Sequence, residues 1–395
     1  MRTVEEHQQV VAGLISARPA VTVPLADALG LALADDVVAP LSLPGFDNSA
    51  MDGYAVLAAD VAAASAENPV KLPVAEDIPA GRTDLLTLAP GTAHRIMTGA
   101  MLPAGATAVV PVESTDAATD IVSIFSSSSE GRHIRRAGED VTAGMTVLPA
   151  GEVLSPAALG LAAALGFAEL KVIPRQRVLV LSTGTELVTP GTPLQPGQIY
   201  ESNAVMLAAA LREAGADVTT APATSDDVAL FRETLADHAK DVDLIVTTGG
   251  VSAGAYEVVK DALSGDVEFV KVAMQPGMPQ GAGTVNGTPI ITLPGNPVSA
   301  LVSFEVFIRP PLRAAMGLTA ERPRRSATLT EKLTSPAGKR QFRRGVVGTD
   351  DEVSSYGPPA SHHLRWLATA NCLLDIGEDV VELAAGSPVP IWDLS

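Results

Sequence analysis

The sequence has one cysteine, few aromatic residues and no long hydrophobic run, and these shortages exclude whole classes of protein. Cys372 alone can form neither an intrachain disulfide nor a cysteine metal cluster. The most apolar stretch, residues 156–168, is about 13 residues long, which is too short to span a bilayer. Residues 1–6 lack the pattern of a secretory signal. We therefore expect a cytoplasmic protein with no direct membrane insertion.

Basic side chains are also in short supply. The 395 residues include 27 Lys and Arg against 45 Asp and Glu, a formal net charge of −18 at pH 7. This charge predicts no nucleic-acid partner, because phosphate backbones need a basic surface. A polyanionic substrate would need a locally basic pocket within an acidic protein. Aromatic residues make up only 4%, so small aliphatic side chains must fill the interior.

The chain is long for a single core and predicts roughly two to four domains. Apolar spacing predicts a helix over residues 4–18 and an Ala/Leu-rich helix over 156–166. Between them, residues 21–139 carry short Val, Leu and Ile runs with many Pro and Gly, which is typical of a mostly β domain. The serines at 126–129 indicate a flexible turn or an exposed loop.

From residue 177 onward, strand-like and helix-like segments alternate. This order predicts a doubly wound α/β domain whose ligands lie at the carboxyl ends of its strands. The predicted strands are 178–181, 218–221, 244–247, 267–272 and 290–293, and the predicted helices are 204–214, 228–238, 257–263 and 298–316. Polar residues at 201–203 and 225–227 are expected to cap two of these helices.

After Gly317 the alternation stops, and residues 322–395 predict a small β-barrel or sandwich. This tail opens with a basic cluster. Its members are Arg322, Arg324, Arg325, Lys332, Lys339, Arg340, Arg343 and Arg344.

Three glycine-rich loops follow apolar runs in the third quarter of the chain. They read Thr247-Thr248-Gly249-Gly250-Val251-Ser252-Ala253-Gly254, Gln275-Pro276-Gly277-Met278-Pro279 and Leu293-Pro294-Gly295-Asn296-Pro297-Val298-Ser299. Backbone N–H groups exposed along such a rim bind anions, so the loops predict a ligand that bears phosphate or another oxyanion. The middle loop contains no cation.

Several carboxylates stand where such a domain holds its ligands, and each has an ordinary structural explanation. Glu186, after the strand at 178–181, could hold a hydroxyl, a ring nitrogen or a metal, or simply occupy a turn. Glu257 could bind Mg²⁺ or lie in the first turn of a helix, where the dipole favours an acid. Asp226 and Asp227 raise the same question, since capping alone explains one of them.

The histidines show no metal-ligand spacing, and the adjacent pair His362-His363 cannot both face one site in a strand.

Two segments nearer the N-terminus are dense in polar groups. These are Pro44-Gly45-Phe46-Asp47-Asn48-Ser49-Ala50-Met51-Asp52-Gly53-Tyr54-Ala55-Val56 and Gly138-Glu139-Asp140. Asp52-Gly53 alone is an ordinary turn pair.

Taken in order along the chain, these segments resemble the MoeA/gephyrin family of molybdopterin molybdenumtransferases. The resemblance also uses Arg95-Ile96-Met97-Thr98-Gly99-Ala100 and Ser182-Thr183-Gly184-Thr185-Glu186-Leu187, and it covers nearly the whole chain. It implies a multidomain α+β and α/β fold and a homodimer. The parts would be a helical linking domain (1–26 and 140–172), a β-rich domain (27–139), a molybdopterin-binding α/β domain (173–317) and a C-terminal β-barrel (318–395).

The family activity would be insertion of molybdate into adenylylated molybdopterin, with Mg²⁺-dependent release of AMP. The resemblance implies catalytic roles for Asp52, Asp140, Glu186 and Asp227. It implies magnesium ligands at Glu186, Asp227 and Glu257. It implies substrate contacts at Thr183, Gly184, Gly249, Gly250, Ser252, Gly254, Pro294, Gly295, Asn296, Ser299, Arg344 and Ser361, with Ser299, Arg344 and Ser361 at positions associated with molybdate. In the family the active site lies between two subunits, so Asp52 would act across the dimer.

The middle loop departs from the family pattern. The family sequence Lys-Pro-Gly-Lys-Pro is replaced by Gln275-Pro276-Gly277-Met278-Pro279, so both lysines are absent. Glu257 also stands where the family has an aspartate. Each charge-assisted hydrogen bond contributes about 1.5–3 kcal/mol, so an uncompensated loss would weaken oxyanion binding by roughly two to four orders of magnitude. Lys260, Lys271 or Arg343 could replace the missing charges.

Two hypotheses of function follow. The first is an active molybdotransferase with a rearranged anion pocket. The alternative is a gephyrin-like dimeric scaffold that binds a peptide segment of a cytoskeletal or membrane-receptor partner, since a binding protein can lose an oxyanion site without penalty. A molybdopterin adenylyltransferase would account for the α/β part alone, and a generic nucleotide enzyme lacks its fingerprint motifs.

Overall fold

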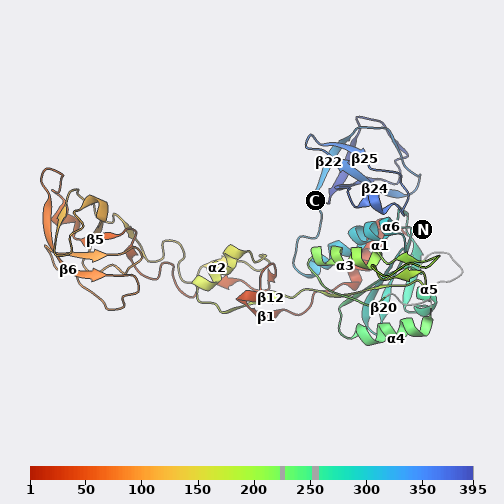
Figure 1. Ribbon diagram of the computed structural model, residues 1–395, viewed down its shortest axis with the longest axis horizontal. Coiled ribbons are helices and arrows are strands. Elements are labelled where there is room, and N and C mark those ends of the chain that lie inside the picture. The colour runs from red at the N-terminus through yellow and green to blue at the C-terminus, as the bar shows by residue number, and fades with distance from the viewer. Residues whose placement is uncertain (223–226, 251–257, 395) are drawn as a thin grey trace. The chain divides into compact units, whose positions relative to one another are not determined.

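The computed structural model describes residues 1–222, 227–250 and 258–394 (Figure 1). These residues form two compact units. Unit 1 contains residues 1–23, 30–34 and 171–394, and unit 2 contains residues 24–29 and 35–170. The finer division into four domains with the boundaries given above remains a prediction.

Unit 1 is built on a six-stranded sheet in the order β16-β13-β17-β21-β20-β18. The first four strands run parallel, as the predicted doubly wound domain requires. Their bounds are β13 (Arg177–Ser182), β16 (Asp217–Thr220), β17 (Leu244–Thr248) and β21 (Thr288–Leu293), followed by β18 (Val267–Lys271) and β20 (Pro279–Val285). The doubly wound α/β expectation is confirmed.

The antiparallel strand β20 was not predicted. Its sequence is rich in glycine, which normally weakens a strand, so the sequence alone indicates a loop. The structure explains the glycines by close approach of neighbouring chains. A Cβ at Gly281 would lie 2.1 Å from Thr292 Oγ1, and one at Gly283 would lie 2.1 Å from the Asp266 carbonyl oxygen. Only glycine fits these positions.

Side chains alternate along the buried strands, so the sheet has two apolar faces. Helices cover both of these faces (Figure 1). Val178 and Val180 face one core, together with α1 (Val4–Leu14), α3 (Asn203–Glu213) and α6 (Pro297–Ser303). Leu179 and Leu181 face the other core, together with α4 (Val228–Ala239) and α5 (Val258–Ala262). The N-terminal helix α1 thus packs on the α/β sheet, within unit 1.

The predicted helix over 298–316 is interrupted. It consists of α6, a π-helical turn η4 (Phe304–Ile308) and α7 (Arg309–Ala315). Pro310 has no N–H to donate to the carbonyl of Val306 four residues earlier. That carbonyl instead accepts a hydrogen bond from Gln8 Nε2 of α1 at 3.1 Å. The interruption therefore fastens the N-terminal helix to the sheet.

The C-terminal part of unit 1 is a closed β-barrel, as predicted (Figure 1). Strands β24, β25, β22, β28 and β26 follow one another, and β26 pairs again with β24. Their bounds are β22 (Arg324–Leu329), β24 (Arg340–Val347), β25 (Glu352–Ser355), β26 (Cys372–Ile376) and β28 (Pro388–Asp393). The smaller elements are β23 (Leu333–Thr334), β27 (Glu382–Leu383) and α8 (Leu364–Leu367).

Short strands complete unit 1. The strand β19 (Met274–Gln275) leaves the α/β domain and pairs in parallel with β24 of the barrel. The strand β2 (Ala32–Leu33) pairs with Val172 and Ile173 of β12 (Glu169–Ile173), and β1 (Val21–Pro24) joins the same small sheet. A further parallel pair is β14 (Leu187–Val188) with β15 (Ile199–Tyr200).

Unit 2 is mostly β, as predicted, around a five-stranded sheet in the order β8-β5-β7-β6-β9. The bounds are β5 (Gly53–Val56), β6 (Val70–Ile78), β7 (Ala93–Ile96), β8 (Ala108–Pro111) and β9 (Ile121–Ile124). Two short pairs join β4 (Asn48–Ser49) to β10 (Ile134–Arg135) and β3 (Val37–Val38) to β11 (Thr146–Leu148). The helix α2 (Pro156–Ala164) begins after Ser155, and short 3-10 turns lie at η1 (Leu25–Asp27), η2 (Ala58–Val61) and η3 (Val112–Ser114).

The serine run of unit 2 is only partly exposed. Residues 126, 127 and 129 are exposed, but Ser128 is buried and its Oγ donates to the carbonyl of Val109 at 3.2 Å. The run is thus an exposed segment outside the strands except at Ser128, whose hydroxyl satisfies a buried strand carbonyl.

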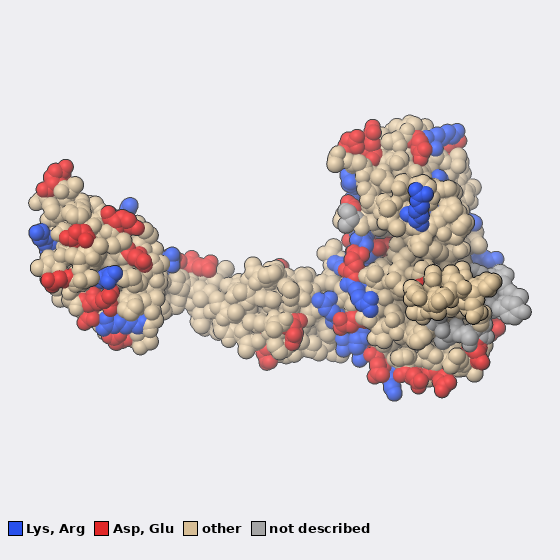
Figure 2. Space-filling view, viewed as in Figure 1, with Lys and Arg blue, Asp and Glu red and all other residues tan. Residues whose placement is uncertain are grey.

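Charged side chains of both signs are scattered over the face of each unit seen in Figure 2, whereas few lie near α2. None of the described helices is long and apolar enough to cross a membrane.

A buried ion-pair cluster joins the π-helical turn to the start of the barrel. Arg322 donates to both carboxylate oxygens of Glu305, at 3.1 and 3.0 Å, and also to Glu213 at 3.0 Å. The side chains of Arg322 and Glu305 are only 8% and 4% exposed. Water therefore cannot replace a lost partner, and this cluster holds residue 322 against the α/β domain.

We predict that Arg322→Met lowers the free energy of unfolding of unit 1 by about 3–5 kcal/mol, because it leaves the buried Glu305 carboxylate without its main partner. The matched control is Lys332→Met, which breaks the exposed Lys332–Glu382 pair and is expected to cost about 0–1 kcal/mol. Urea unfolding monitored by circular dichroism measures both. Equal losses in the two variants would contradict the structural role of the cluster.

Candidate functional site

Three of the predicted loops converge at the carboxyl edge of the parallel strands. Thr183 follows β13, Gly249 follows β17 and Gly295 follows β21, and these strands are neighbours in the sheet. The N–H of Thr183 donates to the carbonyl of Thr248 at 3.1 Å, and that of Gly249 donates to Leu293 at 3.3 Å. A Cβ built on Gly295 would lie 3.5 Å from Gly249 Cα. The predicted backbone contact set is therefore brought together here.

Glycine is required at two of these positions. At Gly249 the backbone φ is +91°, and a Cβ would lie 2.7 Å from the carbonyl oxygen of Thr183. At Gly250 the φ is +65°, and a Cβ would lie 2.8 Å from Val259 Cγ2. Gly184 follows the same strand end as Thr183, and its space is taken by the carboxylate of Glu186. Ser252 and Gly254 lie outside the described residues.

The middle loop reaches the same edge because β20 runs against the parallel strands. It is the turn between β18 and β20, closed by a hydrogen bond from the N–H of Val272 to the carbonyl of Met278 at 2.7 Å. Beneath the turn, Gln280 Nε2 donates to the carbonyl of Gly277 at 2.6 Å and to Ser303 Oγ at 2.7 Å. The buried amide of Gln280 thus fixes the turn to α6.

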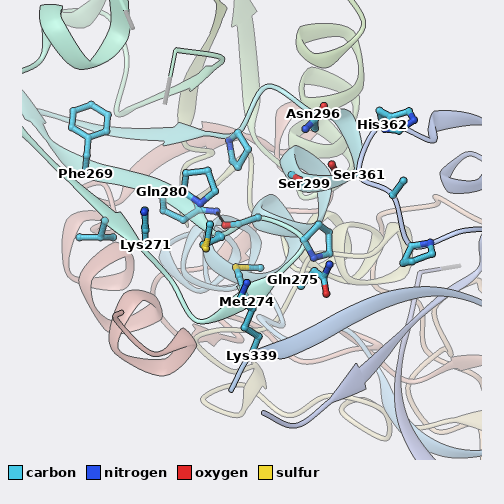
Figure 3. A pocket seen from close by; sticks show the side chains of 18 of the residues that line it. Phe269, Lys271, Met274, Gln275, Gln280, Asn296, Ser299, Lys339, Ser361 and His362 are labelled. Carbon is cyan, nitrogen blue, oxygen red and sulfur yellow. Dashed lines mark hydrogen bonds between the residues drawn. The ribbon is translucent and has the colours of Figure 1, made fainter. Parts of the chain in front are cut away.

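A pocket of about 680 Å³ opens between the middle loop, the loop after β21 and the residues that follow β25 of the barrel (Figure 3). Thr183, Gly184, Gly249, Gly250 and Gly295 are not among its described lining residues. The middle loop, Pro294 and Asn296 line it, as do Ser299 and Ser361. Figure 3 shows Asn296, Ser299 and Ser361 together at one side, with Lys271 at the other. The N–H of Val298 donates to the carbonyl of Ser361 at 3.1 Å, which holds the two serine-bearing segments side by side.

The side chain of Asn296 does not cap α6, the helix that follows it. Ser299 is 4% exposed and lies in the first turn of α6. Hydroxyl and amide groups placed in this way can donate to the oxygens of an anionic ligand.

A cavity of only about 10 Å³, roughly the space of one water molecule, adjoins the pocket beside β24 of the barrel. Arg343, Arg344, Gln275 and Gln341 line it. The guanidinium of Arg344 is buried and donates to two carbonyls, that of His363 at 2.9 Å and that of Pro358. Burial, followed by the charge of the neighbouring Arg343, lowers the pKa of Arg344 below its ordinary value. Arg344 is thus a desolvated cation held only by neutral groups, and an anion beside it would be stabilised.

The described acidic residues predicted in unit 1, Asp227 and Glu186, do not line this pocket. Asp227 is the N-cap of α4, and its carboxylate accepts from the N–H groups of Ala229 and Leu230 at 2.8 and 3.1 Å. Helix capping, the ordinary structural explanation for an aspartate here, therefore applies to Asp227. Glu186 is exposed and its carboxylate folds over Gly184. Asp226 and Glu257 lie outside the described residues.

The motif around Asp52 comes together in unit 2. The Asp52 carboxylate accepts from the Thr98 N–H at 2.7 Å and from the Thr98 hydroxyl at 2.6 Å. These bonds, and then the charge of Arg95, hold the pKa of Asp52 below its usual value. Gly53 is obligatory, because a Cβ there would lie 2.0 Å from the carbonyl oxygen of Val110. An ionised, solvent-facing carboxylate is thus presented at a fixed position.

Asp140 belongs to the same part of unit 2. The N–H of Gly138 donates to Pro44 at 2.9 Å, and that of Asp140 donates to Leu43 at 3.0 Å. The segment around Asp140 therefore lies beside the start of the motif that contains Asp52, and the Asp140 side chain is exposed.

Some lining residues had only a weak signal in the sequence. Lys260, Lys271 and Lys339 line the pocket. The sequence suggests the first two as replacement cations but shows Lys339 only as a member of the basic cluster. His362 also lines the pocket, although its adjacency to His363 argued against a shared site. A loop is free of the strand alternation that this argument assumed, and both histidines lie outside strands.

Comparison with known protein families accounts for almost all of the chain. The MoeA N-terminal region (domain I and II) matches residues 2–166, a probable molybdopterin binding domain matches 179–314, and the MoeA C-terminal region (domain IV) matches 326–394. The pocket described above is lined by residues of the second and third of these matches. The chain belongs to the MoeA family.

Curated relatives extend over the full length. The chain is 67% identical over 405 residues to molybdopterin molybdenumtransferase 2 of Mycobacterium tuberculosis, with 100% of both chains covered. It is 38% identical to molybdopterin molybdenumtransferase 1 of the same organism, covering 99% of this chain and 98% of the relative. A solved structure of a MoeA protein from Pyrococcus horikoshii is 30% identical, with a TM-score of 0.84 and coverage of 100% and 99%. Fold and family thus agree.

We predict that Thr98→Val raises the pKa of Asp52 toward its ordinary value, because the variant loses the hydroxyl donor and keeps the N–H donor. The folded-state pKa is depressed, so the contribution of this interaction to stability is present above the ordinary pKa and is lost as the pH falls through the folded value. Carbon-13 NMR titration of the carboxyl group measures the shift. Thr92→Val, whose hydroxyl donates to Ala89, is the control, and an unchanged Asp52 pKa in Thr98→Val would refute the assignment.

Proposed function

We propose that this chain is a molybdopterin molybdenumtransferase, which inserts molybdate into adenylylated molybdopterin and releases AMP. The observation that carries the proposal is the full-length similarity to proteins of that name, at 67% identity, joined to a pocket equipped for an oxyanion. No observation favours the scaffold hypothesis over the enzyme, and we do not adopt it.

The chemistry needs two kinds of group. Cleavage of the phosphoanhydride bond of the adenylylated substrate by water leaves AMP on one side and a pterin phosphate on the other. The N–H groups of Thr183 and Gly249 already donate to strand carbonyls, so other backbone N–H groups of these loops would be the donors for phosphate oxygens. The hydroxyls of Ser299 and Ser361, with Arg344 behind them, suit a tetrahedral oxyanion such as molybdate.

Mg²⁺ would offset the negative charge of the phosphates. Carboxylates are the right donors for it, and we assign Glu186, Asp227 and Glu257 as its ligands on the strength of the resemblance. Within the described ranges no three acidic, histidine or cysteine side chains come together, and the cap of α4 occupies one oxygen of Asp227. The described residues alone therefore do not complete a magnesium site.

We propose further that the enzyme is a cytoplasmic homodimer. In the family the active site lies between subunits, so the pocket of one protomer would receive Asp52 of the partner subunit. The depressed pKa of Asp52 suits a group that must stay ionised near phosphate. A peptide partner from the cytoskeleton or a membrane receptor stays a prediction of the sequence without an observation behind it.

We predict that Ser299→Ala and Ser361→Ala each lower the rate of AMP release by roughly tenfold, because each removes one hydrogen-bond donor. The reaction contains adenylylated molybdopterin, molybdate and Mg²⁺, and AMP is measured by chromatography. Ser326→Ala, an exposed serine on β22, is the matched control and is expected to leave the rate unchanged. Absence of turnover by the natural protein at every molybdate concentration would refute the proposed function.

Mixed dimers test the shared site. We predict that Asp52→Asn and Arg344→Met homodimers are each nearly inactive, whereas mixing and reassociating them restores activity. The reason is that a mixed dimer keeps one site with both residues intact. Persistent inactivity after verified subunit exchange would place Asp52 and Arg344 in the same subunit's site.

A further inference from the structure

The pocket of unit 1 is cationic even though its central loop is not. Its described lining includes Lys271 and Lys339 and contains neither aspartate nor glutamate. The whole chain carries a net charge of −18. A pocket that gathers ammonium groups and excludes carboxylates in so acidic a protein has the electrostatics of an anion site.

Lys271 lies beside the position of one missing loop lysine. It is the last residue of β18 and pairs with Pro279 of β20, while the next residue, Val272, donates to the carbonyl of Met278. Residue 278 is next to Pro279 along the chain, so alternation directs its side chain away from the face that Lys271 shares with Pro279. Both Lys271 and Met278 nevertheless line the pocket, so the Lys271 ammonium is available to a ligand held there.

Lys339 lies beside the position of the other missing lysine. It directly precedes β24, whose Arg340 and Gln341 pair with Met274 and Gln275 of β19. Lys339 and Gln341 are two residues apart and so extend from the same side of the chain. Gln341 Nε2 donates to Gln275 Oε1 at 3.2 Å, which shows that this side faces position 275.

The ion pairs of the tail distinguish Lys339 from its neighbours. Most members of the basic cluster are bound to carboxylates, namely Arg322, Arg324, Arg325, Lys332 and Arg340. Within the described parts of the chain, Lys339, Arg343 and Arg344 have no such partner, and they line the pocket or the small cavity beside it. Lys271 likewise forms no ion pair with a described residue. Lys271 and Lys339, which line the pocket without a carboxylate partner, therefore leave their charge for a ligand.

We propose that Lys271 and Lys339 bind a tetrahedral oxyanion in this pocket and replace the two lysines that Gln275 and Met278 lack. Resting on the proposed function, the oxyanion is either free molybdate or the phosphoryl group of the pterin substrate. The donors of Asn296, Ser299 and Ser361 meet the same ligand from the opposite side (Figure 3). The charge is supplied from the strands that flank the loop.

The amide pair explains why position 275 tolerates the change. Gln275 uses its oxygen to accept from Gln341, and the Oε1 of Gln341 is buried without a partner. A lysine at 275 would lose the amide pair but would find that unpartnered oxygen as an acceptor. The loop can therefore accept either residue, provided that the cation is supplied nearby.

The test compares Lys271→Gln, Lys339→Gln and the double variant with Lys71→Gln, an exposed lysine on β6 of unit 2. Equilibrium dialysis measures binding of molybdate in one arm and of inorganic pyrophosphate in the other. We expect each pocket substitution to weaken binding roughly ten- to hundredfold, and the control to leave it unchanged. Loss in the molybdate arm assigns the free oxyanion, and loss in the pyrophosphate arm assigns the substrate phosphoryl group.

Two results would overturn the proposal. One is unchanged affinity for both anions in the double variant, and the other is absence of anion binding by the natural protein. A rescue variant sharpens the test, since adding Gln275→Lys and Met278→Lys to the double variant should restore binding. Binding lost in the double variant but not restored by these lysines, with native circular dichroism throughout, would contradict replacement. Binding that needs the lysines in a protein that releases no AMP would uphold the inference and refute the proposed function.

Discussion

The parallel register of β13, β17 and β21 is the constraint on which the rest of the site depends. Because these neighbouring strands run the same way, Thr183, Gly249 and Gly295 emerge at one edge and their backbones approach closely. Glycine at 249 and 250 follows from that approach, since a larger residue would meet Thr183 or Val259. The convergence of these loops at one rim is thus a consequence of strand order before any charged side chain is considered.

The antiparallel strand β20 adds a second wall to the same edge. Its reversal brings the turn at 272–278 beside the parallel loops, and β19 then ties that turn to the barrel through β24. The barrel therefore contributes Lys339, Arg344 and Ser361 to the surroundings of the loop. A sheet of mixed direction, rather than a purely parallel one, lets one pocket use residues separated by long stretches of chain.

The sequence predicted the parallel part of the fold well because its signals are local. Apolar runs of four to six residues indicate buried strands such as Arg177–Ser182. The strand β20 was missed because its glycines are required by close contacts with Thr292 and Asp266, and the sequence does not show these contacts. The π-helical turn was missed because the acceptor left free by Pro310 is satisfied by Gln8, at the other end of the chain. The site followed the same rule: the loops were predicted, but Lys271 and Lys339 were not placed, since only strand pairing puts them beside positions 278 and 275.

The account rests on the claim that this pocket holds an oxyanion between serine hydroxyls and lysine ammonium groups. Anomalous diffraction from crystals of the full chain soaked with tungstate tests the claim most directly. We expect tungsten inside the pocket, with oxygens hydrogen-bonded to Ser299 and to the ammonium of Lys271 or Lys339. Tungsten found only elsewhere, or in the pocket without a contact to either lysine, would contradict the account.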